Sequence, residues 1–240
     1  MKLLLMAHDL VGGQIANWLI ENYRDDVHLV VVKENSPIKE LCEGKVPWTT
    51  QEWIDYSTYT LDFDLGLLAW WPDLIKGDLL TLSKYGWVNT HPSLLPCCRG
   101  KHPNFWAIVD ELPYGVTLHA VEETTDSGPI IAQKEIPYTW EDTGESLFLE
   151  ARTAIFDLFK ETYPIIRELN FKTTLQKERG SSFHHSRELE KKSQIFLKTE
   201  YTGRELLNLL RARTFTGHPS CWFEEDGEKY EVRVNIRRQK

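Results

Sequence analysis

The chain has 240 residues, of which 41% are hydrophobic and 27% are charged, a composition typical of a folded globular protein. Its net charge of −8 is divided unevenly, because residues 1–170 contain 13 Lys and Arg against 26 Asp and Glu, whereas residues 171–240 contain 15 against 10. The acidic main body argues against bulk binding of nucleic acid, and the basic end is either a surface for a phosphate or acidic partner or simply solvated.

Short apolar runs alternate with helical patterns through the first hundred residues. The apolar runs predict buried strands at residues 2–7, 28–33, 63–70 and 85–90. Helical spacing predicts helices at residues 14–23, 74–82 and 103–111, and a short helix at 48–55 capped by Thr49 or Thr50. Continuous apolar strands separated by helices indicate a parallel sheet covered on both faces. We therefore expect an α/β fold, Rossmann-like and mostly parallel, with helices on both faces.

The pattern changes in the second half of the chain. Alternating runs at 116–121 and 129–136 predict an antiparallel pair of strands, and Asp142 and Glu145 resemble a capping box before a long helix that ends near Leu169. We place a domain boundary there, with a main domain at 1–170 and an extension at 171–240. In the extension, residues 171–200 look irregular, a helix follows Thr202, and a β-hairpin turns at Asp226-Gly227.

The start of the chain and its cysteines bear on the compartment. The apolar run at residues 3–6 is too short for a signal peptide or a membrane span. The four cysteines show no CxxC spacing, and reduced thiols are the default without a secretion signal. We therefore expect a cytoplasmic protein with no membrane partner and no metal site.

Three polar residues are candidates for catalysis. Asn89 and His91 lie two apart on a predicted strand that Pro92 ends, so their side chains share one face at the edge where open α/β sheets bind ligands. Imidazole supplies a base near neutral pH, and a neutral amide can donate to a developing oxyanion. Asp126, in the turn of the later strand pair, could orient the imidazole or relay a proton. Each residue alone is more often a turn or a satisfied polar pair.

The sequence around these three residues favours the catalytic interpretation. The segments VNTHPSLLPCCRG (88–100), PNFWAIVDE (103–111) and YGVTLHAVEETTDSGPII (114–131) resemble the core of the formyltetrahydrofolate-dependent transferases. Their pattern is N-x-H-P-S-L-L-P, then G-V-T-x-H, then D-x-G-x-I, and the order of strands and helices is similar over about residues 1–170. The resemblance implies the formyltransferase fold and Asn89, His91 and Asp126 as the catalytic triad.

The same resemblance implies the chemistry. The formyl donor would be N10-formyltetrahydrofolate, held by Trp70, Asp126 and Gly128, and no metal would take part. Asn89 and a protonated His91 would hydrogen-bond the oxyanion, or a neutral His91 would take a proton from the attacking amine. The sequence leaves both roles of His91 open. His119, inside a predicted strand, is more simply structural.

The C-terminal tail limits which molecule can supply the amine that accepts the formyl group. Methionyl-tRNA formyltransferases carry a further domain with a basic surface, whereas this chain has about 70 residues past its core and is acidic overall. The tail, with SRELEK (186–191) and LRARTFTGHPSCWF (210–223) before a short hairpin, instead resembles nucleotide-sugar N-formyltransferases. This resemblance implies dTDP-4-amino-4,6-dideoxyglucose as acceptor in surface-polysaccharide (O-antigen) synthesis. A homodimer through the C-terminal hairpin is expected, with Trp222 and Phe223 in its core. Candidate contacts to the nucleotide sugar are Lys76, Arg99, Asn104, Trp106, His185 and Arg187.

Other functions remain compatible with the sequence. A hydrolase of the same scaffold would release formate by attack of water on the donor, and a transferase could act on another nucleotide sugar or on tRNA. A folate- or nucleotide-binding module without catalysis would keep the fold, although the intact triad argues against it.

Overall fold

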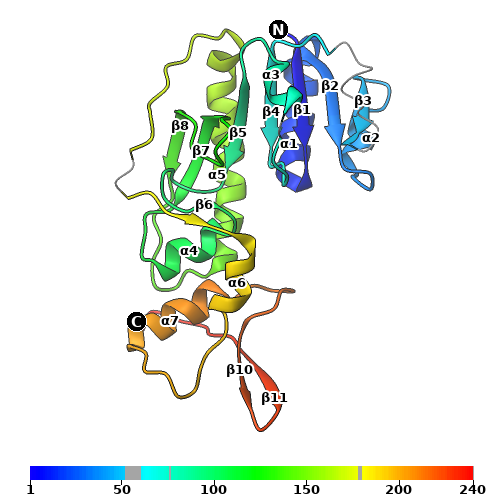
Figure 1. Cartoon of the computed structure of the whole chain (residues 1–240). Helices are drawn as coiled ribbons and strands as arrows, with labels where there is room; N and C mark the ends of the chain where they lie inside the picture. Colours follow the sequence, from blue (N-terminus) through cyan, green and yellow to red (C-terminus); the bar gives the residue numbers. More distant parts are fainter. Residues whose placement is uncertain (52–60, 76, 178–179, 240) are drawn as a thin grey trace. The chain divides into compact units, whose positions relative to one another are not determined.

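The computed structural model describes residues 1–51, 61–75, 77–177 and 180–239 (Figure 1). The chain forms two compact units. The first contains residues 1–91, 117–133 and 155–176, and the second contains residues 92–116, 134–154 and 177–240. The sequence predicted a single boundary at residue 170. The division in the structure differs, because residues 92–116 and 134–154 of the expected main domain belong to the second unit.

A seven-stranded sheet dominates the first unit, in the order β3-β2-β1-β4-β5-β7-β8. The five strands from β3 to β5 pair in parallel and β7 is antiparallel to β5, so the predicted mostly parallel α/β sheet is confirmed. The strand bounds are β1 (Leu3–Ala7), β2 (Val27–Val32), β3 (Trp48–Thr50), β4 (Leu65–Ala69), β5 (Trp87–His91), β7 (Gly115–Ala120) and β8 (Ile130–Glu135).

The order of the strands also indicates the edge of the sheet at which a ligand would be expected to bind. The chain moves from β1 outward through β2 to β3, then returns to β4 on the opposite side of β1 (Figure 1). In open α/β sheets, ligands bind at the carboxyl ends of the strands beside such a reversal. The carboxyl ends of β1, β4 and β5 are therefore the edge at which a site is expected.

Burial on both faces explains why the central strands are continuously apolar. Every residue of β1 is at most 1% exposed. Leu4 and Met6 pack in a cluster that includes Leu79 of α3 (Asp78–Thr81), while α1 (Asp9–Asn22) contacts β1, β2 and β4. The other short helices of this unit are η1 (Arg24–Asp26) and α2 (Ile38–Cys42).

Two expectations about local structure are corrected. Residues 48–50 form the edge strand β3 instead of a helix, because they pair with Val30–Val32 of β2; residues 52–55 of that expected helix lie outside the described residues. The first helix begins at Asp9, five residues before its expected start, and so includes the Gly12-Gly13 pair.

The long helix α5 (Gly144–Arg167) is capped differently from the expectation. Thr143 and Ser146 hold the start of the helix: the Ser146 amide donates to Thr143 Oγ1 (3.2 Å) and the Thr143 amide donates to Ser146 Oγ (3.0 Å). Glu145 instead accepts two hydrogen bonds from Thr216. The capping box is therefore one residue later than the sequence indicated.

The second unit contains short elements, several of them in the segment that was expected to be irregular. Residues 183–192 form β9 (Phe183–His184), which pairs in parallel with β6 (Arg99–Gly100), and then α6 (Ser186–Lys192). Helix α7 (Gly203–Ala212) starts with the capping box of Thr202 and Glu205 and contacts α4 (Pro103–Val109).

Two features of the second unit follow directly from its residues. Arg211 of α7 is 5% exposed, and its guanidinium donates to the carbonyls of Thr139 and Asp142 at 2.7 and 3.0 Å.

The predicted hairpin is confirmed as β10 (Cys221–Glu225) and β11 (Glu228–Val232). Asp226 and Gly227 are both at positive φ, as a two-residue hairpin turn requires.

Gly66 of β4 provides a test of the packing beside the predicted site. A Cβ at this position would lie 2.1 Å from ring carbons of Trp87, which is 1% exposed on the neighbouring strand β5. We expect Gly66→Ala to lower the free energy of unfolding by about 1–3 kcal/mol, because overpacking forces Trp87 or the backbone to move.

Urea denaturation of the variant measures this loss. Gly203→Ala is the matched control, since no atom lies within 4 Å of a Cβ there, and a change of less than about 0.5 kcal/mol is expected. Equal stability of Gly66→Ala and the wild type would contradict the packing described for β4 and β5.

Candidate active site

Strand β5 presents two of the predicted residues at its carboxyl end. Asn89 and His91 lie on one face of the strand, and the neighbouring Trp87 and Val88 are each 1% exposed. Pro92 follows directly, and a proline cannot donate to the strand ladder. His91 is 6% exposed and Asn89 is partly exposed.

The antiparallel neighbour β7 adds a residue that the sequence did not assign to the site. Asn89 pairs with His119 in the register of β5 and β7, and Asn89 Nδ2 lies 3.1 Å from His119 Nε2. His119 Nδ1 lies 2.8 Å from the carbonyl oxygen of Ala120. A carbonyl can only accept, so Nδ1 carries the proton and Nε2 accepts from Asn89. His119 therefore fixes the orientation of the Asn89 amide.

The environment of His119 keeps its ring neutral. The side chain is 2% exposed. Burial first, and then the neighbouring His91, lowers the pKa of His119 to about 4. A neutral ring agrees with the hydrogen bonds, since a doubly protonated imidazole would have no acceptor for the Asn89 amide.

Asp126 reaches the same cluster from the turn between β7 and β8. Its Oδ1 lies 3.6 Å from His91 Nδ1 and 3.7 Å from His119 Nε2, and its side chain is 11% exposed. Both distances exceed a normal hydrogen bond, and His119 Nε2 has no proton to offer. Asp126 therefore interacts chiefly with Nδ1 of His91. The structure brings all three predicted catalytic side chains together, with His119 as a fourth member.

Gly128 has a structural reason to be glycine. A Cβ at this position would lie 1.8 Å from the carbonyl oxygen of Ala120, and the Ala120 amide donates to the carbonyl of Pro129 at 2.9 Å. The backbones of β7 and the Asp126 turn therefore approach too closely for a side chain. A role of Gly128 in holding the donor stays a prediction.

Trp70 lies at the carboxyl end of β4, beside β5. Its backbone is in the left-handed region, at φ 57°. Its amide donates to Thr90 Oγ1 at 2.8 Å, and Thr90 Oγ1 donates to the Leu68 carbonyl at 3.1 Å. Thr90 of β5 thus fixes the backbone of Trp70 at the carboxyl edge of the sheet.

Arg99, Asn104 and Trp106 belong to the second unit, where all three have contacts within the protein. Asn104 Nδ2 donates to the Gly144 carbonyl at the start of α5 (2.8 Å). Trp106 is 6% exposed, and its ring stacks on His184 with centroids 3.8 Å apart and an interplanar angle of 7°. The guanidinium of Arg99 lies over the ring of Phe183, 6.0 Å from its centroid. A base that stacked on this face of Trp106 would have to displace His184.

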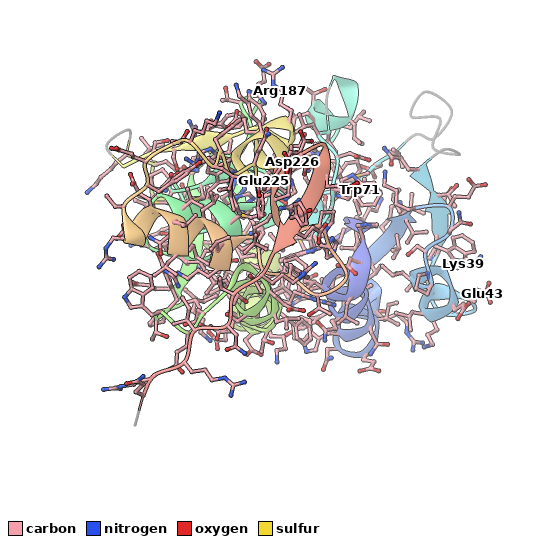
Figure 2. The ribbon with its side chains drawn as sticks, turned by 90° about the horizontal axis from the view of Figure 1, so that it is seen from below. Lys39, Glu43, Trp71, Arg187, Glu225 and Asp226 are labelled. Atoms are coloured by element: carbon pink, nitrogen blue, oxygen red, sulfur yellow. The ribbon has the colours of Figure 1, made fainter. Side chains whose placement is uncertain are left out.

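The remaining predicted contacts are on α6 or outside the described residues. His185 is exposed at the N-terminus of α6, where its amide donates to Glu188 (3.2 Å). Arg187 lies on the exposed side of the same helix (Figure 2). His184, which the sequence did not select, is held by Trp106 and lies 3.3 Å from the Asp110 carboxylate. Lys76 lies outside the described residues.

One atom of the cluster indicates where a ligand would bind. His91 Nε2 is buried and has no hydrogen-bond partner among the residues that the structure describes. Buried polar atoms are nearly always satisfied, so an unpaired one calls for a ligand or an ordered water. Within the described ranges, no three His, Cys, Asp or Glu side chains group as metal ligands.

Comparison with known proteins assigns the family. A sequence model described as "Formyl transferase" matches residues 28–159, more than half of the chain. The chain belongs to the formyl transferase family. A second model, the N-formyltransferase dimerization C-terminal domain, matches residues 188–238. No helix in the described part of the chain is long and apolar enough to span a membrane.

Individual relatives agree with this family. A dTDP-4-amino-4,6-dideoxyglucose formyltransferase of Mycobacterium bovis is 30% identical over 154 residues, which are 64% of this chain and 65% of that protein. A sugar N-formyltransferase from Shewanella sp. superposes with a TM-score of 0.84 at 21% identity, covering 100% of this chain and 99% of the other. A 4-N formyltransferase from Francisella tularensis gives 0.82 at 22% identity, covering 99% of both. These two structures show the same fold.

The neutral state of His119 predicts a specific dependence of stability on pH. Because its pKa is lowered to about 4 in the folded protein, the unfolded chain binds more protons between about pH 6.5 and 4. The stability contributed by the neutral ring is complete above that range and is lost as the pH falls through it.

Urea unfolding of the wild type and of His119→Gln at about pH 7 and about pH 4.5 isolates this effect. Gln keeps an acceptor for Asn89 but does not titrate. On acidification, the wild type should lose roughly 2–3 kcal/mol more stability than the variant. Parallel losses in the two proteins would show that His119 is not held neutral.

Proposed function

We propose that this protein transfers a formyl group from N10-formyltetrahydrofolate to the amine of a nucleotide-linked amino sugar. The observation that carries the proposal is the convergence of Asn89, His91 and Asp126 at the carboxyl end of β5 in a chain of the formyl transferase family. In acyl transfer to an amine, an amide donor can stabilise the oxyanion, an imidazole can move the proton, and a carboxylate can orient the imidazole.

Asn89 would stabilise the developing charge. N10-formyltetrahydrofolate supplies the electrophilic formyl carbon, and negative charge builds up on the formyl oxygen when an amine attacks. The Asn89 amide nitrogen carries two hydrogens, and one of them is bonded to His119. The second remains for the formyl oxygen, and His119 keeps it in a fixed direction, as preorganised stabilisation requires.

His91 would act through Nε2. Its Nδ1 faces the Asp126 carboxylate at 3.6 Å, while Nε2 is the buried nitrogen without a partner among the described residues. In the neutral ring with its proton on Nδ1, Nε2 accepts the proton of the attacking amine and returns it to N10 as the bond between the formyl carbon and N10 breaks and tetrahydrofolate leaves. In the doubly protonated ring, Nε2 donates to the formyl oxygen. Asp126 supports either role, because its carboxylate faces Nδ1 and orients the ring.

For the acceptor, we propose dTDP-4-amino-4,6-dideoxyglucose, for surface-polysaccharide (O-antigen) synthesis. The mycobacterial relative named for that substrate supports this choice. A Helicobacter canadensis N-formyltransferase was crystallised with folinic acid and dTDP-3-aminofucose, which supports folate and a dTDP-sugar as the ligand pair. Arg99, His185 and Arg187 are our proposed contacts to the nucleotide, and Trp70 and Gly128 our proposed contacts to the donor.

We further propose a cytoplasmic homodimer formed through the C-terminal hairpin. The match of residues 188–238 to a dimerization domain supports it. The hairpin presents Tyr230, which is 48% exposed and stacks on Phe223 across the strands, so an aromatic pair is available to a second copy. All four cysteines are free thiols, which suits a reducing compartment.

Alanine substitutions test the catalytic assignment. His91→Ala should lower kcat by about 10²–10⁴, the usual contribution of a general acid or base. Asn89→Ala should lower it by about 10²–10³, the usual effect of losing one oxyanion donor. Transfer from N10-formyltetrahydrofolate is followed under saturating acceptor, and circular dichroism checks that the fold is kept. A wild-type rate in either variant contradicts the assignment.

Thermal shifts with nucleotide sugars test the acceptor. A ligand of the folded state stabilises by about 2.7 kcal/mol when its free concentration is one hundred times its Kd. The melting temperature should therefore rise with dTDP-4-amino-4,6-dideoxyglucose and respond less to GDP-linked amino sugars. Formate release is measured in parallel without any amine. Release as fast as transfer would identify a hydrolase instead.

A further inference from the structure

The side chain of Gln176 is tied to the turn that carries Asp126. Its Nε2 donates two hydrogen bonds, one to the Asp126 carbonyl (2.9 Å) and one to the Gly128 carbonyl (2.8 Å). Both acceptors are carbonyl oxygens, which cannot donate. The orientation of the amide follows from this, because the flipped form would place Oε1 against two oxygens.

The backbone next to Gln176 is fixed as well. Thr174 forms an antiparallel bridge with Ile130 at the start of β8, and each amide donates to the other carbonyl at 2.8 Å. Gln176 follows two residues later in the chain. The segment after α5, which the sequence indicated as irregular, thus lines the edge strand of the sheet and brings one amide side chain to the Asp126 turn.

The turn has features that call for such support. Asp126 is at φ 52°, a region that side chains other than glycine seldom adopt and that persists only where the surroundings hold it. Local bonds secure one side of the turn, since Ser127 Oγ donates to the Thr124 carbonyl at 2.9 Å. Gln176 secures the two carbonyls that flank Ser127 from a segment about fifty residues away.

We infer that Gln176 is a positioning residue for the formyl transfer. By holding the carbonyls of Asp126 and Gly128, it keeps the Asp126 carboxylate at its place beside the His91 ring. The inference rests on the proposed role of Asp126, whose carboxylate faces the His91 ring. Gln176 itself acts on the backbone of the turn, through its two hydrogen bonds to carbonyl oxygens.

Two variants of similar length separate the hydrogen bonds from the bulk of the side chain. Gln176→Met removes both donors, and Gln176→Lys restores an N–H donor to the same carbonyls. Misplacing a catalytic group by about 1 Å can cost about a hundredfold in rate, so we expect Gln176→Met to lower kcat between about tenfold and a hundredfold. The KM for dTDP-4-amino-4,6-dideoxyglucose should stay unchanged, and Gln176→Lys should recover most of kcat.

The controls exclude a general loss of folding. Gln14→Met, at an exposed position of α1, should keep the wild-type kcat. Melting temperatures are recorded for every variant. Amide hydrogen exchange of residues 124–128 should be faster in Gln176→Met than in the wild type and should return toward the wild-type rate in Gln176→Lys. This readout needs no acceptor. If Gln176→Met does not fold, Gln176→Glu, which has the same size and no N–H, takes its place with the same expected loss.

The outcomes distinguish this inference from the proposed function. A wild-type kcat in Gln176→Met, or an equal loss in Gln176→Met and Gln176→Lys, overturns the positioning role. Asp126→Ala is measured beside them. If Asp126→Ala keeps the wild-type kcat, the catalytic assignment fails, whatever the hydrogen exchange shows for the Gln176 variants.

Discussion

The register between β5 and β7 is the constraint on which the site depends. It places Asn89 opposite His119 and His91 opposite Thr117, so one face of two neighbouring strands carries the amide and both imidazoles. Because side chains alternate along a strand, a slip of one residue would turn this set to the other face. The parallel core fixes β5 from its other side, where Trp87 of β5 covers Gly66 of β4.

Hydrogen bonding within the cluster assigns a different partner to each group. His119 donates to the Ala120 carbonyl and accepts from Asn89, so it has no proton for the nearby carboxylate. Asp126 is left to interact with Nδ1 of His91. Burial supports this arrangement, because it keeps His119 neutral. The result is one oriented amide and one imidazole whose Nε2 is directed away from the carboxylate, both at the edge where open α/β sheets bind ligands.

The second unit uses several of its polar and aromatic residues for its own structure. Asn104 holds the start of α5, Trp106 stacks on His184, and Arg211 is bonded to two carbonyls. These contacts explain why such residues occur in the sequence without reference to a ligand. Arg187 of α6, by contrast, is exposed (Figure 2), and so is His185, which directly precedes this helix.

The sequence by itself determined the parallel α/β sheet, the hairpin at Asp226-Gly227 and the residues of the candidate triad, because apolar runs, turn residues and a spaced motif are local signals. It did not determine β3, which is a strand only because it pairs with β2. Nor did it assign His119 or Gln176 to the site. Their contacts join segments 30 to 50 residues apart, and strand register and chain reversal, which no local pattern encodes, decide which of these segments meet.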